Sequence, residues 1–379
     1  MPASGASNLF LGRDTKVFAM KGTSIWQIPV LNGYAFSQST NTSEVTVEEM
    51  SNLAGDSRRG RKMFNDSVSP AEWSFESYAR PFINGTPEHR SVDELLWASI
   101  SGNATYDDVA GTWSSSITPS ATHMDIDFDS SNKVSLGTFD LYFVLGANAV
   151  TGLNYVADGS TTIYRIPNAV VNEVTIPFDV NGITTLSWNG MGGNIEEVAS
   201  FDATAAITAG TDKTNNFIRS RFTALGAVSS ISGTEVTYGI TITGGTITIS
   251  NNISFLTPEE LGKVNAPIAH VTGGRSVSGS FSCYMDEVTN GSIDLYEDIV
   301  NATNTVTNSF ALDFYIGGKD PANDRPIGPG LQIKMPTAHL EVPSINPDDI
   351  VSLEVNFSAL PTTLAATDEI ERITFVGVA

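Results

Sequence analysis

The chain has 379 residues, of which 41% are hydrophobic and 16% are charged, and its formal net charge is −22. This length fits two domains of ordinary size, each long enough to bury its own core. The acidic balance argues against a protein that binds nucleic acid, which needs a basic face, and against docking on anionic lipid. The single cysteine, Cys283, excludes a disulfide framework within one chain.

Export and membrane signals are missing from the sequence. The first residues lack the basic and apolar regions of a secretory signal. The longest apolar stretch, residues 141–150, contains Gly and Asn and is far shorter than the roughly 20 residues of a membrane helix. We therefore expect a protein that is made and folded in a cytoplasm and enters no membrane.

The first half of the chain combines turns, one helix and strands. Ser91 and Glu94 have the spacing of a capping box, so we predict a helix over residues 91–100. Residues 139–146 then have the pattern of a mostly buried strand. Asn-Gly pairs predict turns here and further along the chain, at 32–33, 84–85, 181–182, 189–190 and 290–291.

The second half is again rich in strands. Residues 234–250 alternate on both sides of Gly244 and Gly245, which predicts a hairpin with a two-residue glycine turn. A helical turn is expected at 257–261, and a short amphipathic helix at 290–300. Two further segments alternate with a period of two and are predicted as strands, residues 277–284 and 350–357.

The two halves resemble each other. Residues 139–146 match residues 310–317, and residues 166–169 match residues 335–338. Other matches occur in the same order, namely 47–50 with 258–261, 74–78 with 280–284, 96–100 with 295–299 and 182–187 with 349–354. The separation falls steadily along the chain, as small loop deletions in a second copy would produce. This order favours a tandem duplication over the general likeness of unrelated β domains.

A domain organisation follows from the repeat. We expect a mainly β protein with two tandem β-sandwich or barrel domains, each with a short flanking helix, over residues 1–198 and 226–379. The joint between them, residues 199–225, is rich in Ala, Thr, Gly and Asn and has few large apolar residues. Such a composition is typical of a linker or a long surface loop.

Catalytic and cofactor motifs are not found. The histidines are never close enough in sequence to form a ligand pair, and they are His89, His123, His270 and His339. The chain has no nucleophile elbow and no phosphate-binding loop followed by a helix. We therefore expect no enzyme activity, no cofactor and no metal.

Asp125, Asp127 and Asp129 alternate along one segment. Their spacing resembles the start of a calcium loop, but Ser130 and Leu136 stand where that loop needs Gly and Glu. On a strand the three carboxylates would share one face. The better interpretation is an acidic stripe that is solvated or faces a lumen.

A basic cluster interrupts the acidic chain at Arg58, Arg59, Arg61 and Lys62. One interpretation is a solvated loop. The other is a docking patch, because like-signed molecules associate in one register when a basic loop of one meets the acidic surface of the next.

Three stretches resemble the tail tube proteins of long-tailed phages, namely residues 23–44, 57–78 and 328–343. The resemblance covers most of the chain outside the joint. It implies compact β-sandwich or barrel domains that join edge to edge into a ring with a continuous inner β-barrel. It also implies that rings stack into a hollow tube and that a long loop, here about 37–72, contacts the next ring.

The resemblance and the repeat together imply a trimeric ring with pseudo-sixfold symmetry, since each chain would supply two ring domains. A negative lumen would repel DNA phosphates and let the genome slide. The implied partners are further copies of the chain, the tape-measure protein, and the terminator and tip proteins of a non-contractile tail. The implied location is the virion, after assembly in the host cytoplasm.

Another function class fits a β-rich chain. A surface adhesin or decoration protein of a virion would use similar sandwiches, and it would show a discrete apolar or aromatic pocket without stacked assembly. The tryptophans are scattered and indicate no such pocket. An enzyme of unknown class has the weakest support.

Overall fold

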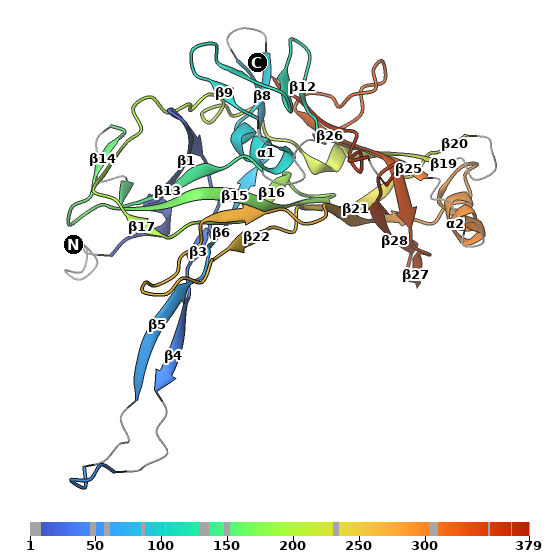
Figure 1. The fold of residues 1–379 in the computed structure, drawn as a ribbon. Coiled ribbons are helices and arrows are strands. Elements are labelled where there is room, and N and C mark those ends of the chain that lie inside the picture. Colours follow the sequence, from blue (N-terminus) through green and yellow to red (C-terminus); the bar gives the residue numbers. More distant parts are fainter. Residues whose placement is uncertain are drawn as a thin grey trace.

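The computed structural model shows a chain built mainly from strands, which confirms the predicted mainly β fold (Figure 1). The described residues are 9–45, 51–56, 61–84, 88–102, 104–128, 136–147, 152–229, 235–302, 310–347, 349–364 and 366–378.

One series of antiparallel strands crosses both halves of the chain and is called the central sheet here. Its order is β3, β6, β16, β15, β21, β24, β28 and β27. The bounds are β3 Ala35–Ser37, β6 Ala71–Tyr78, β16 Thr185–Gly192, β15 Thr162–Asp179, β21 Ile242–Ser250, β24 Ser276–Tyr284, β28 Val351–Ala359 and β27 Ser344–Pro347. β3 and β27 therefore stand at the two ends of this series.

Each half adds strands to the central sheet. In the first half β2 pairs with β1, β1 with β13, and β13 with the first part of β15. In the second half β20 pairs with β19, β19 with β25, and β25 with β26. The bounds are β1 Lys16–Lys21, β2 Ser24–Ile28, β13 Phe139–Leu145, β19 Ala224–Ser229, β20 Val236–Tyr238, β25 Phe310–Ile316 and β26 Gly330–Leu340.

The pairing registers agree between the halves. Ser74 lies opposite Asn189, and Ser280 lies opposite Asn356. The β13–β15 and β25–β26 pairs have a register shift at the same place, directly after Phe139 and Phe310 respectively. The matched segments of the sequence therefore occupy matched positions in the sheet.

Two short α-helices lie among the described residues, α1 (Glu94–Ser101) and α2 (Ser292–Ala302). Both fall where the sequence predicted a helix. Every residue of α1 is buried, and α1 lies over the middle of the central sheet, whereas α2 lies at one end of the body (Figure 1). On α2 only Ser292, Leu295 and Ile299 are buried.

The predicted capping box is wrong. The helix begins at Glu94, and its N-cap residue Asp93 makes no side-chain capping bond. Ser91 Oγ donates to Asp93 Oδ1 at 2.5 Å instead. Glu94 points into the core, where Trp26 Nε1 donates to Glu94 Oε1 at 3.1 Å. Pairing inside the core has replaced capping of the helix.

The predicted glycine hairpin is also wrong. Gly244 and Gly245 lie inside β21, which continues through them with a register shift. A Cβ at Gly245 would lie 2.6 Å from the Phe178 ring and 2.3 Å from the Ser280 carbonyl oxygen. Glycine is required here because a ring from the adjacent strand covers the position, which is a known role of glycine inside strands.

Two other local predictions fail. The expected turn at Asn189-Gly190 lies inside β16, and a Cβ at Gly190 would lie 2.3 Å from the Trp73 ring. The expected helical turn at residues 257–261 is part of the loop that joins two paired strands, β22 and β23, so its backbone follows the hairpin.

The remaining elements are short. They are η1 Gly12–Asp14, β4 Thr40–Val45, β5 Lys62–Val68, β7 Pro81–Asn84, β8 Glu88–Ser91, β9 Tyr106–Asp107, β10 Thr112–Trp113, β11 Ile117–Pro119, β12 Met124–Ile126, β14 Asn154–Val156, β17 Glu196–Glu197, β18 Ser200–Asp202, η4 Ser220–Phe222, β22 Ser254–Leu256, β23 Ala269–Val271 and β29 Arg372–Val376. β29 pairs with β12 on one side and β26 on the other, so the last strand connects the two halves.

The segment between the halves is anchored to the first half. Arg80 donates to the carbonyl oxygens of Gly210, Thr211 and Lys213 at 2.7–3.0 Å. Its Nε also donates to Asn216 Oδ1 at 3.2 Å. Because Arg80 is only 7% exposed, these bonds satisfy a buried cation.

Candidate assembly surfaces

One face of the central sheet is polar. Its strands alternate buried and outward side chains, as a sheet with one covered side requires. Ser187, Thr175, Thr248 and Ser278 form one row across four strands. The polar face is defined here as the outward side chains of β6, β16, β21, β24 and β28 and of residues 173–179.

Hydrogen bonds run across this face. The Thr175 and Thr248 hydroxyls lie 3.2 Å apart, where the first half meets the second. Asn189 Nδ2 donates to Glu173 Oε1 at 3.0 Å. Ser187 Oγ donates to Glu76 Oε1 at 3.2 Å. These bonds fix short polar side chains flat against the sheet.

The charge of the polar face has one sign. β6, β16, β21, β24 and β28 contain no lysine or arginine, and Arg165 of β15 lies outside residues 173–179. The charged members of the face are Glu72, Glu76, Glu173, Asp179 and Glu354. The face would therefore repel a polyanion.

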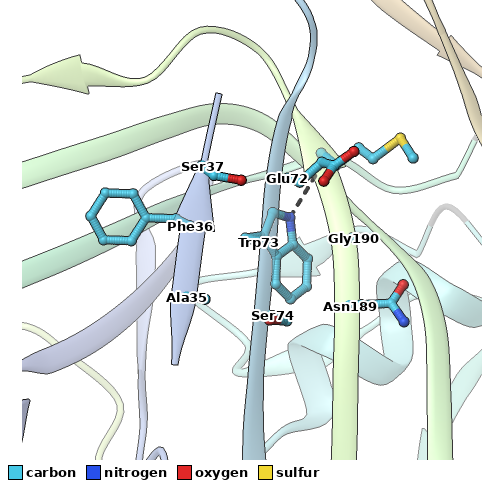
Figure 2. A pocket seen from close by; sticks show the side chains of 9 residues that line it. Ala35, Phe36, Ser37, Glu72, Trp73, Ser74, Asn189 and Gly190 are labelled. Atoms are coloured by element: carbon cyan, nitrogen blue, oxygen red, sulfur yellow. Dashed lines mark hydrogen bonds between the residues drawn. The ribbon is translucent and has the colours of Figure 1, made fainter. Parts of the chain in front are cut away.

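A hollow of about 250 Å³ lies at the β3 end of the sheet (Figure 2). Its walls come from β3, β6 and β16. The Trp73 ring lies beside Gly190, and Trp73 Nε1 donates to the Met191 carbonyl oxygen at 3.3 Å. Glu72 is the only charged side chain lining the hollow.

A hairpin arm, β4 and β5, projects away from the body (Figure 1). All residues of β4 are exposed. Three large apolar side chains of the arm are about half exposed, namely Val45, Met63 and Phe64. Such a set of exposed apolar groups on a projecting hairpin is typical of an interaction surface.

The arm carries part of the predicted basic cluster. Arg61 Nε donates to Glu44 Oε1 at 2.5 Å, and this bond lowers the pKa of Glu44 and raises that of Arg61. The Lys62 ammonium lies 5.1 Å from the centroid of the Phe64 ring. Arg58 and Arg59 lie outside the described residues.

The base of the arm contacts the corresponding loop of the second half. Val68 N donates to Asn265 O at 2.8 Å, and Asn265 N donates to Asp66 O at 3.1 Å. Asn265 belongs to the loop between β22 and β23. The base of the arm and this loop are therefore joined within one chain.

The predicted acidic stripe is tied to a neighbouring strand. On β12, Asp125 accepts a hydrogen bond from Thr374 Oγ1 at 2.6 Å and lies 3.0 Å from His123 Nε2. Burial, and then the nearby Asp125 carboxylate, raise the pKa of Asp127. Asp129 lies outside the described residues. β12 lies on the opposite side of the body from the arm (Figure 1).

A buried ion cluster surrounds the start of α1. Arg90 Nη1 lies 3.3 Å from Glu94 Oε1, and Arg90 Nη2 lies 3.1 Å from Glu88 Oε2. Both Arg90 and Glu94 are almost fully buried. Burial raises the pKa of Glu94, and the Arg90 charge opposes that shift. The cluster holds the helix to β8 and is structural.

The ranges that the structure describes hold no group of three or more His, Cys, Asp or Glu side chains that could bind a metal ion. Among the described helices, none has the length and apolar composition needed to cross a membrane.

Comparison with known proteins identifies a family and a relative. The model of the phage tail tube protein family matches residues 92–359. The chain belongs to the phage tail tube protein family. It is also 28% identical to the tail tube protein pb6 of Escherichia phage T5 over an alignment of 379 residues. This alignment covers 96% of this chain and 75% of that protein. As a tail tube protein, the chain is a structural component of the phage tail that assembles with itself.

The polar face of this tail tube protein was missed by sequence reasoning. A signal existed, because serine occupies every second position from Ser276 to Ser282 on β24. Alternation alone does not say which side a sheet covers, so the face needed the pairing partners of β24. These are β21 and β28, whose outward residues are polar as well.

Proposed function

We propose that three chains form a ring with pseudo-sixfold symmetry and that such rings stack into the tail tube. The proposed tube domains are residues 1–198 and 226–379, with residues 199–225 as the joint. The support is the shared strand order and register of the two halves. Closing the strands into a ring removes the exposed edges that cause aggregation.

The polar face is proposed as the lining of the lumen. Its charged side chains are acidic and none is basic, so the face offers DNA phosphates no cation to bind. Its serines and threonines are held by cross-strand bonds such as that between Thr175 and Thr248. The tube would conduct DNA as a passive channel, without catalysis and without a cofactor.

The hairpin arm is proposed as the contact between rings. Arg58, Arg59, Arg61 and Lys62 would meet the acidic surface of the next ring, and the apolar arm residues would add buried area. Arg61 is paired with Glu44 in the single chain, so a contact of Arg61 in trans would have to share or replace that ion pair. The proposed partners beyond the chain itself are the tape-measure, terminator and tip proteins of a virion assembled in the host cytoplasm.

Electron microscopy of the purified chain at high concentration, together with its mass in solution, tests this function. Hollow tubes with three chains per ring are the expected result. Rings of six chains would keep the conduit but contradict two ring domains per chain. A monomer that bound a glycan or cell surface, and formed no tubes on any initiator, would favour an adhesin.

Reversing the charge at Arg58, Arg59 and Arg61 tests the arm. Stacking should be lost while single rings persist, because the arm projects from the body and every residue of β4 is exposed. Reversal at Arg219 and Arg221, which are exposed elsewhere, is the matched control and should leave tubes intact. Tubes of normal length from the arm variant would contradict a role in stacking.

A further inference from the structure

The central sheet ends in two open edges. β3 pairs with β6 on one side and β27 pairs with β28 on one side, and neither has a second neighbouring strand among the residues described. The two strands lie well apart in the molecule (Figure 1). A single chain therefore cannot join them to each other.

The chain contains a template for what covers such edges. Residues Glu173–Asp179 of β15 pair antiparallel with Gly244–Ser250 of β21, so that the first half is joined to the second. Among the eight strands of the central sheet, as far as the structure describes them, this is the junction at which a strand of one half pairs with a strand of the other.

The shared registers place β27 and β3 at the two sides of an equivalent junction. Ser344 faces Glu354 in the second half as Thr175 faces Ser187 in the first half. In the same way, Ala35 faces Ser74 on β6 in the first half. In the second half the corresponding pair is Thr246 of β21 and Ser280 of β24. β27 is thus the counterpart of the covered part of β15, and β3 is the counterpart of β21.

Burial differs between the template and the open edges. Ile176 of β15 and Ile247 of β21 lie directly opposite each other and are both 0% exposed. Ile345, the counterpart of Ile176, is 45% exposed. Phe36, the counterpart of Ile247, is half-buried. The apolar surface that is buried at the internal junction is therefore at least partly exposed at β27 and β3, the two open edges of the sheet.

We infer that β27 of one chain pairs antiparallel with β3 of the next chain, in the register of the internal junction. Ser344 then faces Ser37, Ile345 faces Phe36 and Asn346 faces Ala35. The partner is a second copy of this chain, and the inference rests on the proposed ring. Because the contact joins unlike edges, each added copy leaves the same two edges open until a ring closes.

The side-chain pattern specifies this register. Pairing as inferred puts Ser344 and Ser37 on the polar face, where Thr175 and Thr248 bond inside the chain. It puts Ile345 and Phe36 on the core side. A slip by one residue would turn Ile345 onto the polar face, since side chains alternate along a strand.

Paired cysteines test the register. Ser37→Cys with Ser344→Cys should give disulfide-linked oligomers on a non-reducing gel when the protein assembles, and the products should revert to single chains on reduction. Thr175→Cys with Thr248→Cys is the positive control and should cross-link within one chain. Ala35→Cys with Ser344→Cys is two residues out of register and should not cross-link, because a disulfide needs Cα atoms within about 7 Å.

The native Cys283 does not interfere. It is fully buried, and burial raises its pKa to about 11, so it stays a protonated thiol. Single-cysteine variants at 37 and 344 check this. Amide hydrogen exchange of the unmodified protein gives a second readout, since amides within residues 35–37 and 344–346 should become protected on assembly.

The outcomes separate the register from the function. Tubes in which the in-register cysteine pair stays reduced, or in which only the out-of-register pair forms a disulfide, would overturn the inferred pairing. They would still support the proposed tube function. Cross-linked rings that never stack would support the edge pairing and count against the tube. Monomers without cross-links or new amide protection under conditions that yield no tubes would contradict both.

Discussion

The two halves share strand order and register but place their large side chains on opposite strands. In the first half Trp73 of β6 covers Gly190 of β16. In the second half the arrangement is reversed, because Phe357 of β28 covers Gly279 of β24. β28 is the counterpart of β16, and β24 is the counterpart of β6. In both halves a large ring on one strand fills the space over a glycine on the paired strand. Either strand can carry the ring as long as the volume is filled.

The helices differ in how much they are covered. α1 is buried on every side, whereas α2 keeps an exposed face. Strands β8, β9 and β12 lie near α1 (Figure 1), whereas the described residues have no strand between β24 and α2 or between α2 and β25. A polar helix surface was unnecessary at α1 because these added strands cover it.

The strongest expected contrast is between Ile176 and Ile345. Ile176→Asp should prevent folding, since it places an unpaired charge at a fully buried position. Ile345→Asp should leave the isolated chain folded, because the side chain already meets water, but should abolish assembly. Circular dichroism melts measure the first effect, and sedimentation with electron microscopy measures the second.

Val109→Asp is the matched control. Val109 is 98% exposed and lies away from both sheet edges, in the turn between β9 and β10. It should change neither the melting temperature nor assembly. A folded Ile176→Asp chain, or tubes built from Ile345→Asp, would contradict the equivalence of the internal junction and the inferred contact at β27.

Trp73 and Phe357 should contribute similarly to the free energy of unfolding. Trp73→Ala and Phe357→Ala each remove a ring that is 2% exposed, so each should lower the free energy of unfolding by about 3–5 kcal/mol. Denaturant unfolding of both variants measures the loss. Ser278→Ala on the polar face is the control and should stay within about 0.5 kcal/mol. A cost at Phe357 of less than half that at Trp73 would break the equivalence.

Much of the fold could be predicted from the sequence. The strands predicted at 139–146, 277–284 and 350–357 occur as β13, β24 and β28, and both helices occur where their patterns fall. Two of the glycine predictions failed, and they failed for one reason. Gly190 and Gly245 were interpreted by local turn preference, but each is required by a ring on the adjacent strand. Which strand is adjacent is a long-range fact, and local patterns do not contain it.

The assembly surfaces were less accessible to sequence reasoning. The basic cluster was visible as a run, but the pairing of Arg61 with Glu44 depends on the β4–β5 register. The polar face depends on strands separated by most of the chain, such as β6 and β28. The inferred contact between β27 and β3 could not be predicted at all without the internal junction as its template.

The smallest contrast concerns the starts of the two helices. Before α1 lies the buried Asp93, whereas α2 begins with the neutral Ser292. Burial is the main cause that raises the pKa of Asp93 to about 6, so the folded chain holds this proton more tightly than the unfolded chain. Its contribution to stability is therefore complete below about pH 4 and is lost as the pH rises through 6, by on the order of 3 kcal/mol. Asp93→Asn should remove that part of the pH dependence. Glu94 has a raised pKa as well and stays in both proteins, so the difference between wild-type and variant unfolding free energies from pH 4 to 7 isolates Asp93. A difference that did not change with pH would mean that Asp93 keeps its charge when folded, held by Arg80.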